Sequence, residues 1–449
     1  MATLAPVDPA ISEPDPAALI AARPHLRMDA RDGLLLDGVP LAAIARDLGT
    51  PTWVYSAPTL LARYRQLRDA MAETGLDAHI HYAVKANDHR AVLSLLAREG
   101  AGADVVSGGE LRRARAAGIA AAQIVFSGVG KSEDEMRLAL AENIAQLNVE
   151  SAEELAMLSA LATAMGRTAR IALRVNPDID AGTHAKISTG RARDKFGIPY
   201  AEAAALYAHA ARLPGIVPVG VATHIGSQIL SLAPFRAAYQ RIAALVGDLR
   251  AAGQSVAVVD CGGGLGIPYR DEIAPSPAGL AAVIRNAFAA LDVSVKLEPG
   301  RWLVGPAGLL LARVVLQKQT GAARFVVLDA AMNDLIRPAM YEAWHGIVPL
   351  SPVALHAPCT EADIVGPVCE TGDTFARGRM LPDLPPGALV ALLDAGAYGA
   401  VMSSTYNARP LAAEAMVGGN SYAVIRPRQP IEALWGEEIL PPWLDAPRA

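Results

Sequence analysis

The chain has 449 residues, of which 52% are hydrophobic and 19% are charged, and its formal net charge is −5. This length favours two domains, and the apolar content excludes a disordered protein. The charges are spread along the chain and no apolar run could cross a bilayer, so we expect neither a nucleic-acid partner nor a membrane partner. The cysteines, Cys261, Cys359 and Cys369, fit neither a zinc site nor a disulfide framework. We therefore expect no metal site and a reducing, cytoplasmic compartment.

The first 19 residues are acidic and rich in proline, and they lack the basic start and apolar stretch of a secretory signal. We expect residues 1–28 to form a loose leader. Residues 29–49 follow, and the segment LLLDGVPL at 34–41 is typical of a hairpin with an Asp-Gly turn. We expect these N-terminal strands to join a β domain that is predicted near the other end of the chain.

Between residues 50 and 304, apolar strand-like runs alternate with segments of helical periodicity. One helix should begin at Ser132, because Glu135 stands at the spacing of a capping box. Eight alternating strands in about 250 residues are typical of an α/β protein with a (β/α)8 TIM-type barrel, and an open doubly wound sheet is the alternative. The strands are expected near 78–85, 102–106, 124–127, 145–150, 169–177, 217–224, 256–261 and 293–298.

After residue 305, short apolar runs are interrupted by glycine, proline and asparagine, and helical periodicity almost disappears. This pattern is typical of short strands joined by turns. We therefore expect residues 305–449 to form a C-terminal β domain that is mostly antiparallel.

Polar side chains gather at the expected carboxyl ends of the barrel strands, where chemistry takes place in such barrels. The stretch HYAVKAND at 81–88 ends an apolar strand on Lys85. A lysine at a strand end can simply extend its amine into water, which is the ordinary interpretation. The other polar residues at these ends are Asp104, Ser107, Ser127, Glu150, Arg174, Asn176, His224 and Glu298. So many of them at one predicted rim favour a functional site.

Three glycines follow the seventh expected strand in the segment VVDCGGGLGI. Gly262, Gly263 and Gly264 would let backbone amides approach an anion, and barrels commonly bind phosphate in the loops after strands seven and eight. A tight turn between a strand and a helix is the alternative. The segment is not a dinucleotide fingerprint, because Ile267 stands where the last glycine should be, and GVGKS at 128–132 lacks the glycine that a nucleotide-binding loop needs at Val125.

Two further segments place polar side chains at strand ends. In LEPGRWLVG, Glu298 closes the eighth expected strand and Arg301 follows three residues later. They could form a surface ion pair, or they could pair with a ring nitrogen and with a substrate carboxylate. In THIGSQI, His224 and Ser227 end the sixth strand. A lone histidine is more often a packed residue, but an imidazole can also stack on a flat ring.

Colinear segments distributed over residues 30–435 carry a resemblance to a known family. They are YAVKAN, GADVVSGGEL, FSGVGKSEDE, RVNPDIDAGTH, STGRARDKFGI, HIGSQI, GGGLGI, EPGRWLVG, DAAMNDLIRPAMY, GPVCETGD and DAGAYGAVMSSTYNARP. The sequence resembles the alanine-racemase-like, fold-type III enzymes that use pyridoxal 5'-phosphate (PLP), and within this group it resembles the diaminopimelate decarboxylases. The resemblance implies a PLP-dependent decarboxylation of meso-2,6-diaminopimelate to L-lysine and carbon dioxide, the last step of lysine biosynthesis.

The resemblance also implies how the cofactor is bound. Lys85 would be the Schiff-base lysine, and Glu298 would lie beside the pyridine nitrogen, where a carboxylate raises the proton affinity of that nitrogen. His224 would stack on the ring. The remaining cofactor-binding residues implied by the resemblance are Asp104, Ser227, Gly262, Gly263, Gly264, Gly300, Arg301 and Tyr398.

For the substrate, the resemblance implies arginines for the distal carboxylate and an acid for the distal ammonium. The arginines are Arg301 and Arg337, with Tyr341 and Tyr398 nearby, and the acid is Glu370. Cys369 would donate a proton after carbon dioxide departs, although a free cysteine is usually a small buried hydrophobic residue. In this family the GPVCE segment comes from the partner subunit, which implies a homodimer with a shared active site.

Alternative functions differ in the residues they require. A sibling decarboxylase would act on lysine, ornithine or a conjugated diamino acid, and Glu370 together with HIGSQI favours diaminopimelate instead. A racemase should lack the Cys-Glu pair at 369–370. A non-catalytic PLP-binding paralogue should have lost Lys85, Cys369 or the arginines, and all of these are present.

Overall fold

The structure is a computed structural model that describes residues 13–182, 190, 195–321 and 323–445. Parts of the RVNPDIDAGTH and STGRARDKFGI segments, and residues 1–12 of the predicted leader, lie outside the described residues. No helix in the described ranges is both long enough and apolar enough to span a membrane.

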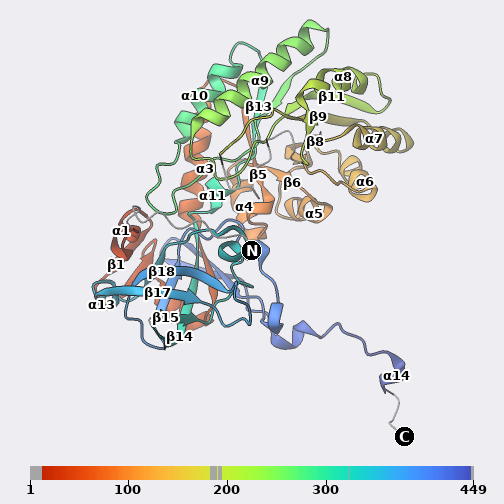
Figure 1. Cartoon of the computed structure of the whole chain (residues 1–449). Coiled ribbons are helices and arrows are strands. Elements are labelled where there is room, and N and C mark those ends of the chain that lie inside the picture. Colours follow the sequence, from red (N-terminus) through yellow and green to blue (C-terminus); the bar gives the residue numbers. More distant parts are fainter. Residues whose placement is uncertain (1–12, 183–189, 191–194, 322, 446–449) are drawn as a thin grey trace. The chain divides into compact units, whose positions relative to one another are not determined.

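The chain divides into two compact units (Figure 1). We call the first the barrel unit; it comprises Ala57–Gly308 and Asp394–Val401. We call the second the β unit; it comprises Met1–Ser56, Leu309–Leu393 and Met402–Ala449.

The barrel unit contains the predicted (β/α)8 barrel. Its parallel strands pair in the order β9, β11, β12, β13, β5, β6, β7, β8, and a further pairing of β8 with β9 closes the sheet. The eight strands are β5 (Ala78–Ala83), β6 (Gly102–Val105), β7 (Ile124–Phe126), β8 (Gln146–Val149), β9 (Ala169–Asn176), β11 (Ile216–Ala222), β12 (Val258–Asp260) and β13 (Ser294–Leu297). A short strand, β10 (Ile198–Pro199), adds to β9. The barrel fold is thus confirmed, and the doubly wound alternative is wrong because the sheet closes.

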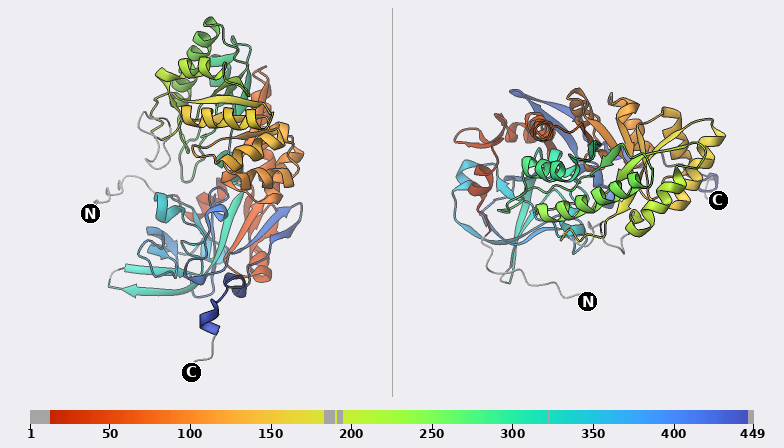
Figure 2. Two further views of the ribbon diagram at one scale, coloured as in Figure 1. Left: turned by 90° about the vertical axis from the view of Figure 1, so that its right-hand side faces the viewer. Right: turned by 90° about the horizontal axis from the view of Figure 1, so that it is seen from above.

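Helices lie on the outside of the barrel strands in the views of Figures 1 and 2. They are α3 (Ala57–Ala72), α4 (Arg90–Arg98), α5 (Gly108–Ala116), α6 (Glu133–Glu142), α7 (Ala152–Ala164), α8 (Tyr200–Ala210), α9 (Leu232–Ala251), α10 (Pro277–Phe288) and α11 (Arg301–Val304). The predicted capping box at α6 is confirmed, because Ser132 and Glu135 each accept a hydrogen bond from the other's backbone amide. The helices α5, α7, α9 and α10 begin in a similar way. Each is preceded by a serine whose hydroxyl accepts a hydrogen bond from a backbone amide of the first turn.

The β unit is mostly antiparallel, as predicted. Its large sheet has the order β18-β17-β15-β14-β4-β20-β21, with β16 and β19 attached through β14, and the pairs β15–β17 and β20–β4 are parallel. Its strands are β4 (Thr52–Ser56), β14 (Gly308–Thr320), β15 (Ala323–Leu328), β16 (Ile347–Pro349), β17 (Cys359–Val365), β18 (Thr374–Pro382), β19 (Leu389–Leu392), β20 (Ala413–Gly418) and β21 (Ser421–Arg426). Figure 2 shows β14 and β15 as a long antiparallel pair.

A small sheet and short helices complete the β unit. The strands β1 (Leu26–Asp29), β2 (Gly33–Leu36) and β3 (Val39–Pro40) form the small sheet, in which the predicted Asp-Gly turn has positive φ at Asp37 and Gly38. The helices are α1 (Pro16–Ala21), α2 (Leu41–Leu48), α12 (Arg337–Tyr341), α13 (Pro352–Leu355) and α14 (Pro442–Asp445).

Three segments do not belong to the domains to which the predicted limits assigned them. Within the predicted leader, α1 is ordered because Leu19 and Ile20 are buried in the hydrophobic core of the β unit. The strand β4 lies within the predicted barrel range, but it pairs with β20 in the β unit. Asp394–Val401 lies within the predicted β domain, but it belongs to the barrel unit, where the amide of Tyr398 donates to the carbonyl oxygen of Ala86 at 2.8 Å.

Candidate active site

Lys85 lies at the carboxyl end of β5, in a single 3-10 turn formed by residues 84–86. Its amine donates to Oδ2 of Asp104 at 2.9 Å, and the Asp104 side chain is fully buried at the end of β6. Burial by itself lowers the pKa of Lys85, but the negative charges of Asp104 and Glu298, with a contribution from Tyr398, raise it above its usual value. The strand ends therefore hold a cationic amine against buried carboxylates.

Glu298 follows β13 and is 7% exposed. Its Oε1 accepts hydrogen bonds from Nδ2 of Asn148 at 3.2 Å and from Oγ of Ser127 at 3.3 Å. Its carboxyl group also bonds to the carboxyl group of Asp260, and burial, with the charges of Asp104 and Asp260, raises the pKa of Glu298 well above its ordinary value. Two carboxyl groups can share a hydrogen bond only through a proton, so this pair keeps one negative charge between them.

The interior of the barrel continues this polar arrangement toward the other end of the strands. The Lys296 amine donates to Oε1 of Gln146 at 2.8 Å, and Nε2 of Gln146 donates to Oδ1 of Asn148 at 2.7 Å. Nδ2 of Asn148 lies 3.4 Å from Oδ2 of Asp260. Barrel interiors are usually filled by branched aliphatic side chains. Here a chain of hydrogen bonds instead connects Lys296 to Glu298.

The loop after β12 contains three glycines that no other residue could replace without moving backbone. A Cβ atom at Gly262, Gly263 or Gly264 would lie 2.3, 2.2 or 2.4 Å from a carbonyl oxygen of a neighbouring loop. Gly262 and Gly264 also have positive φ. Oδ1 of Asp260 accepts from the amide of Gly262 at 3.0 Å, so the same aspartate contacts both the glycine loop and Glu298.

His224 lies beside this loop at the end of β11. Its Nδ1 accepts from the amide of Gly263 at 3.2 Å, so the hydrogen of the neutral ring is on Nε2. Burial, with the positive charges of Arg174 and Lys85, lowers the pKa of His224 well below its ordinary value. The imidazole is therefore neutral near pH 7. Stacking on another flat ring does not require a charge on the imidazole.

Arg301 begins α11 and joins several predicted residues. It donates to Oη of Tyr269 at 2.7 Å and to Oγ of Ser227 at 3.1 Å, and its guanidinium lies 5.0 Å from the ring centre of Tyr398. Tyr398 is partly buried and has a φ of 56°. A Cβ atom at Gly300 would lie 3.0 Å from Cβ of Ala86 and 3.3 Å from Cβ of Ala83, so glycine lets this loop lie close to the turn that carries Lys85.

Two predicted substrate residues, Arg337 and Tyr341, begin and end the helix α12 of the β unit. Arg337 is 5% exposed, and its Nη1 lies 2.6 Å from Nε2 of His345. Nδ1 of His345 lies 2.8 Å from the carbonyl oxygen of Leu393, which can only accept, so Nε2 accepts from the guanidinium. This contact fixes the direction of Arg337.

Cys369 and Glu370 lie on a turn between β17 and β18 in the β unit, and both are exposed. Asp373 organises this turn, because Oδ2 accepts from the amide of Val368 at 2.7 Å and Oδ1 accepts from the amide of Met332 at 2.6 Å. The hydroxyl of Tyr406 donates to Oε1 of Glu370 at 2.7 Å. The structure thus presents the thiol and the carboxylate on the surface of this unit.

The structure brings the predicted cofactor residues together in the barrel unit, and it places Arg337, Tyr341, Cys369 and Glu370 in the β unit. The sequence analysis did not identify five residues of these sites, which are Asn148, Asp260, Tyr269, Asp373 and Tyr406. One signal was available, because Gln146, Asn148 and Glu150 alternate along the strand that is expected near 145–150. Polar residues at every second position of such a strand indicate a polar barrel interior.

The barrel residues fit the PLP that the sequence implies. The glycine loop packs closely against neighbouring carbonyl oxygens and carries no side chain that could keep an anion from its backbone. Lys85 offers a primary amine, and the Asp260–Glu298 pair offers a buried negative charge. Oδ1 of Asp104 is buried and has no hydrogen-bond partner among the described residues. A buried carboxylate oxygen without a partner is costly, and a ligand with a hydrogen-bond donor would supply one.

Comparison with known proteins places these features in a family. Residues 59–305 match the family of pyridoxal-dependent decarboxylases through its pyridoxal-binding domain. A diaminopimelate decarboxylase of Zymomonas mobilis is 48% identical, and the match covers 92% of this chain and 98% of that protein.

Solved structures agree with this match. The diaminopimelate decarboxylase of Helicobacter pylori, solved with L-lysine, is 40% identical, with a TM-score of 0.85 over 88% of this chain and 98% of that one. The diaminopimelate decarboxylase of M. jannaschii, also solved with L-lysine, is 36% identical, with a TM-score of 0.88 over 94% of this chain and 99% of that one.

Proposed function

Because this chain belongs to the diaminopimelate decarboxylase family of pyridoxal-dependent decarboxylases, we propose that it converts meso-2,6-diaminopimelate to L-lysine and carbon dioxide with PLP as cofactor. The observation that supports this most strongly is the barrel rim. There the amine of Lys85, the buried charge of Glu298 and the glycine loop lie within one compact unit.

Each rim residue has a task in this reaction. When bound, PLP supplies an electron sink for the electron pair that departing carbon dioxide leaves behind. Lys85 provides the amine that holds the cofactor, and Asp104 orients this amine at 2.9 Å. Glu298 shares one hydrogen with Asp260, and the remaining negative charge would face the ring nitrogen and favour its protonated form. The amide of Gly264, with Ser227, would bind the phosphate, because the amides of Gly262 and Gly263 already donate to Asp260 and His224.

Substrate recognition would use the charged residues that sequence analysis identified. Arg301, held by Tyr269 and Ser227, provides a fixed guanidinium at the rim of the barrel. We propose Arg337 for the distal carboxylate and Glu370 for the distal ammonium, since arginine binds carboxylates through two parallel hydrogen bonds. A substrate without the distal carboxylate would lose the contact with Arg337.

The direct test is to measure carbon dioxide release from a panel of diamino acids with and without added PLP. We expect rapid release from meso-diaminopimelate, dependence on PLP, and much slower release from L-lysine and ornithine. Rapid release from ornithine or L-lysine, with none from diaminopimelate, would instead identify a sibling decarboxylase. PLP binding without release from any member of the panel would identify a non-catalytic paralogue.

We further propose that the enzyme works as a homodimer in which Cys369 and Glu370 complete the partner's barrel site. The exposure of both side chains on an ordered turn supports this arrangement. The proposal also includes a reducing, cytoplasmic compartment, which the free thiols of Cys261, Cys359 and Cys369 support.

Mixing two inactive variants tests the shared site. If Lys85→Ala and Cys369→Ala chains are unfolded and refolded together in equal amounts, half of the dimers should be mixed. Each mixed dimer then contains one intact site, so the mixture should regain about one quarter of wild-type activity. A mixture that is no more active than its two parents measured separately would show that each site is built from a single chain.

A further inference from the structure

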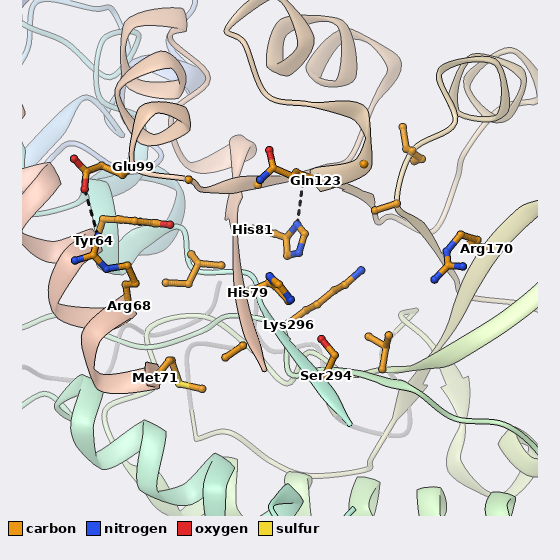
Figure 3. Close-up of a pocket in the computed structure, with 18 of the residues that line it drawn as sticks. Tyr64, Arg68, Met71, His79, His81, Glu99, Gln123, Arg170, Ser294 and Lys296 are labelled. Carbon is orange, nitrogen blue, oxygen red and sulfur yellow. Dashed lines mark hydrogen bonds and ion pairs between the residues drawn. The ribbon is translucent and has the colours of Figure 1, made fainter. Parts of the chain in front are cut away.

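A cavity lies at the amino-terminal end of the barrel strands, and we call it the floor pocket (Figure 3). Its volume is about 650 Å3, and its lining includes the first residues of three strands, Ala78, Gly102 and Ser294. Lys85 and Glu298 follow the last residues of β5 and β13, so they lie at the opposite ends of these strands. The floor pocket is therefore distinct from the candidate active site.

Positive charge predominates among the side chains that line the floor pocket. Arg68, Arg170 and Lys296 contribute cations. Glu99 contributes an acid, which accepts two hydrogen bonds from Arg65 and forms an ion pair with Arg68. Arg68 also pairs with Asp69, so Lys296 and Arg170 are the cations relevant to an anion. Burial lowers the pKa of Lys296, the negative charges of Asp260 and Glu298 oppose this shift, and the charge of Arg170 adds to it. An anion between Lys296 and Arg170 would relieve their repulsion.

The two ring nitrogens of His81, which lines this pocket, differ in their hydrogen bonds. Its Nδ1 lies 3.1 Å from the carbonyl oxygen of Gln123, which can only accept, so Nδ1 carries the hydrogen. Its Nε2 is buried and has no hydrogen-bond partner in the part of the chain that the structure describes. Burial, and then the charge of Lys296, lower the pKa of His81 to about 3, so the ring is neutral near pH 7. Nε2 is therefore an acceptor that lacks a donor among the described residues.

Both the ring and the amine are held in place. A Cβ atom at Gly102 would lie 2.3 Å from the carbonyl oxygen of Gln123 and 2.6 Å from Nδ1 of His81, so only glycine leaves room for this imidazole. Lys296 is fixed by its hydrogen bond of 2.8 Å to Gln146. Figure 3 shows the His81 ring below Gln123 and the Lys296 amine directed toward the side where Arg170 lies.

We propose that the floor pocket binds a small oxyanion that retains a hydroxyl hydrogen, of which hydrogen phosphate is the simplest. Its oxygens would accept from Lys296 and Arg170, and its hydroxyl would donate to Nε2 of His81. Charge and hydrogen-bond direction are then satisfied together, because phosphate and carboxylate oxygens accept strongly from lysine and arginine. This site does not depend on the proposed decarboxylation.

Calorimetric titration of the PLP-loaded protein with inorganic phosphate tests the proposal, since the cofactor then occupies the phosphate-binding loop at the rim. We expect one saturable site per chain, and sulfate, which has no hydrogen to donate near pH 7, should bind roughly tenfold more weakly. Cofactor absorbance, recorded during the titration, would show whether phosphate displaces PLP. Saturable binding that is absent, or equal for the two anions, would overturn the proposal.

Two exposed arginines make a matched pair of variants. Arg170→Ala should weaken phosphate binding roughly tenfold or more, because it removes a charge-assisted contact. Arg112→Ala, which removes an exposed arginine from α5, should leave binding unchanged. Equal affinities of the wild type and Arg170→Ala, or equal losses in the two variants, would refute a specific site at the floor.

Discussion

The barrel unit and the β unit hold their candidate site residues by different means. In the barrel, Lys85, Glu298 and the glycine loop lie at strand ends and are connected through buried hydrogen bonds. In the β unit, Cys369 and Glu370 lie on an exposed turn that Asp373 organises from beneath.

This difference indicates that the barrel unit binds the cofactor and that the β unit acts during turnover. A cofactor that stays bound needs buried partners whose positions are fixed by many contacts, as around Glu298. Groups that meet a substrate on each turnover need access, as at Cys369. Changes in the barrel should therefore affect cofactor binding, whereas changes in the β unit should affect turnover with the cofactor still bound.

The largest effect is expected in the barrel. Lys85→Ala removes the amine that attaches the cofactor, so the absorbance of the lysine-bound cofactor should disappear and kcat/KM should fall on the order of a thousandfold or more. Lys318→Ala, at an exposed position of β14, is the control and should leave both unchanged. A Lys85→Ala protein with the wild-type cofactor spectrum would refute the assignment.

Cys369→Ala should show the opposite pattern. Removal of a general acid typically lowers the rate by a factor on the order of a hundred or more, so kcat should fall while PLP affinity and absorbance stay the same. Cys359→Ala removes another thiol of the β unit and serves as the control. If Cys369→Ala turned over as fast as the wild type, the proton would have to come from another group.

Arg337→Ala should alter substrate choice more than overall rate. We expect kcat/KM for diaminopimelate to fall by roughly tenfold to a hundredfold, because one charge-assisted hydrogen-bonded contact is lost. The value for L-lysine, which has no distal carboxylate, should change much less. The ratio of the two values within one variant corrects for any loss of folded protein caused by breaking the His345 contact. Equal losses on both substrates would argue against the carboxylate contact.

The smallest expected effects concern stability, and their pH dependence has opposite signs in the two units. In the barrel, the pKa of His81 is lowered to about 3 by burial and by Lys296. Below about pH 6.5 the unfolded chain therefore binds a proton that the folded chain does not bind. The free energy of unfolding should fall by about 2 kcal/mol between pH 6.5 and pH 5. His81→Gln should remove this loss, whereas the exposed His356→Gln should not.

In the β unit, burial raises the pKa of Asp334 to about 6. Between about pH 4 and pH 6 the folded chain therefore keeps a proton that the unfolded chain releases. The contribution of Asp334 to the free energy of unfolding is complete below about pH 4 and is lost as the pH rises toward 6. The loss is on the order of 2–3 kcal/mol. Asp334→Asn should abolish it, since an amide oxygen can still accept from Ala331. Thermal unfolding at several pH values measures both effects, and wild-type pH dependence in either variant would contradict the assignment.

Much of the fold could be predicted because it depends on local periodicity. Each barrel strand lies within two residues of its predicted limits, and the helix after Ser132 begins at its capping box. Strand ends in a barrel converge on one rim, so Lys85, His224 and Glu298 could be assigned to one site from their positions alone.

The sequence by itself determined the barrel, the β domain, the family and the residues at the strand ends, because alternation, turn residues and colinear segments are local signals. Only the tertiary structure decided that β4 pairs with β20, that Tyr398 joins the barrel unit, and that Asp260 contacts Glu298. These contacts join residues that are far apart in the chain. Their partners are fixed by closure of a sheet and by burial, which no local pattern encodes.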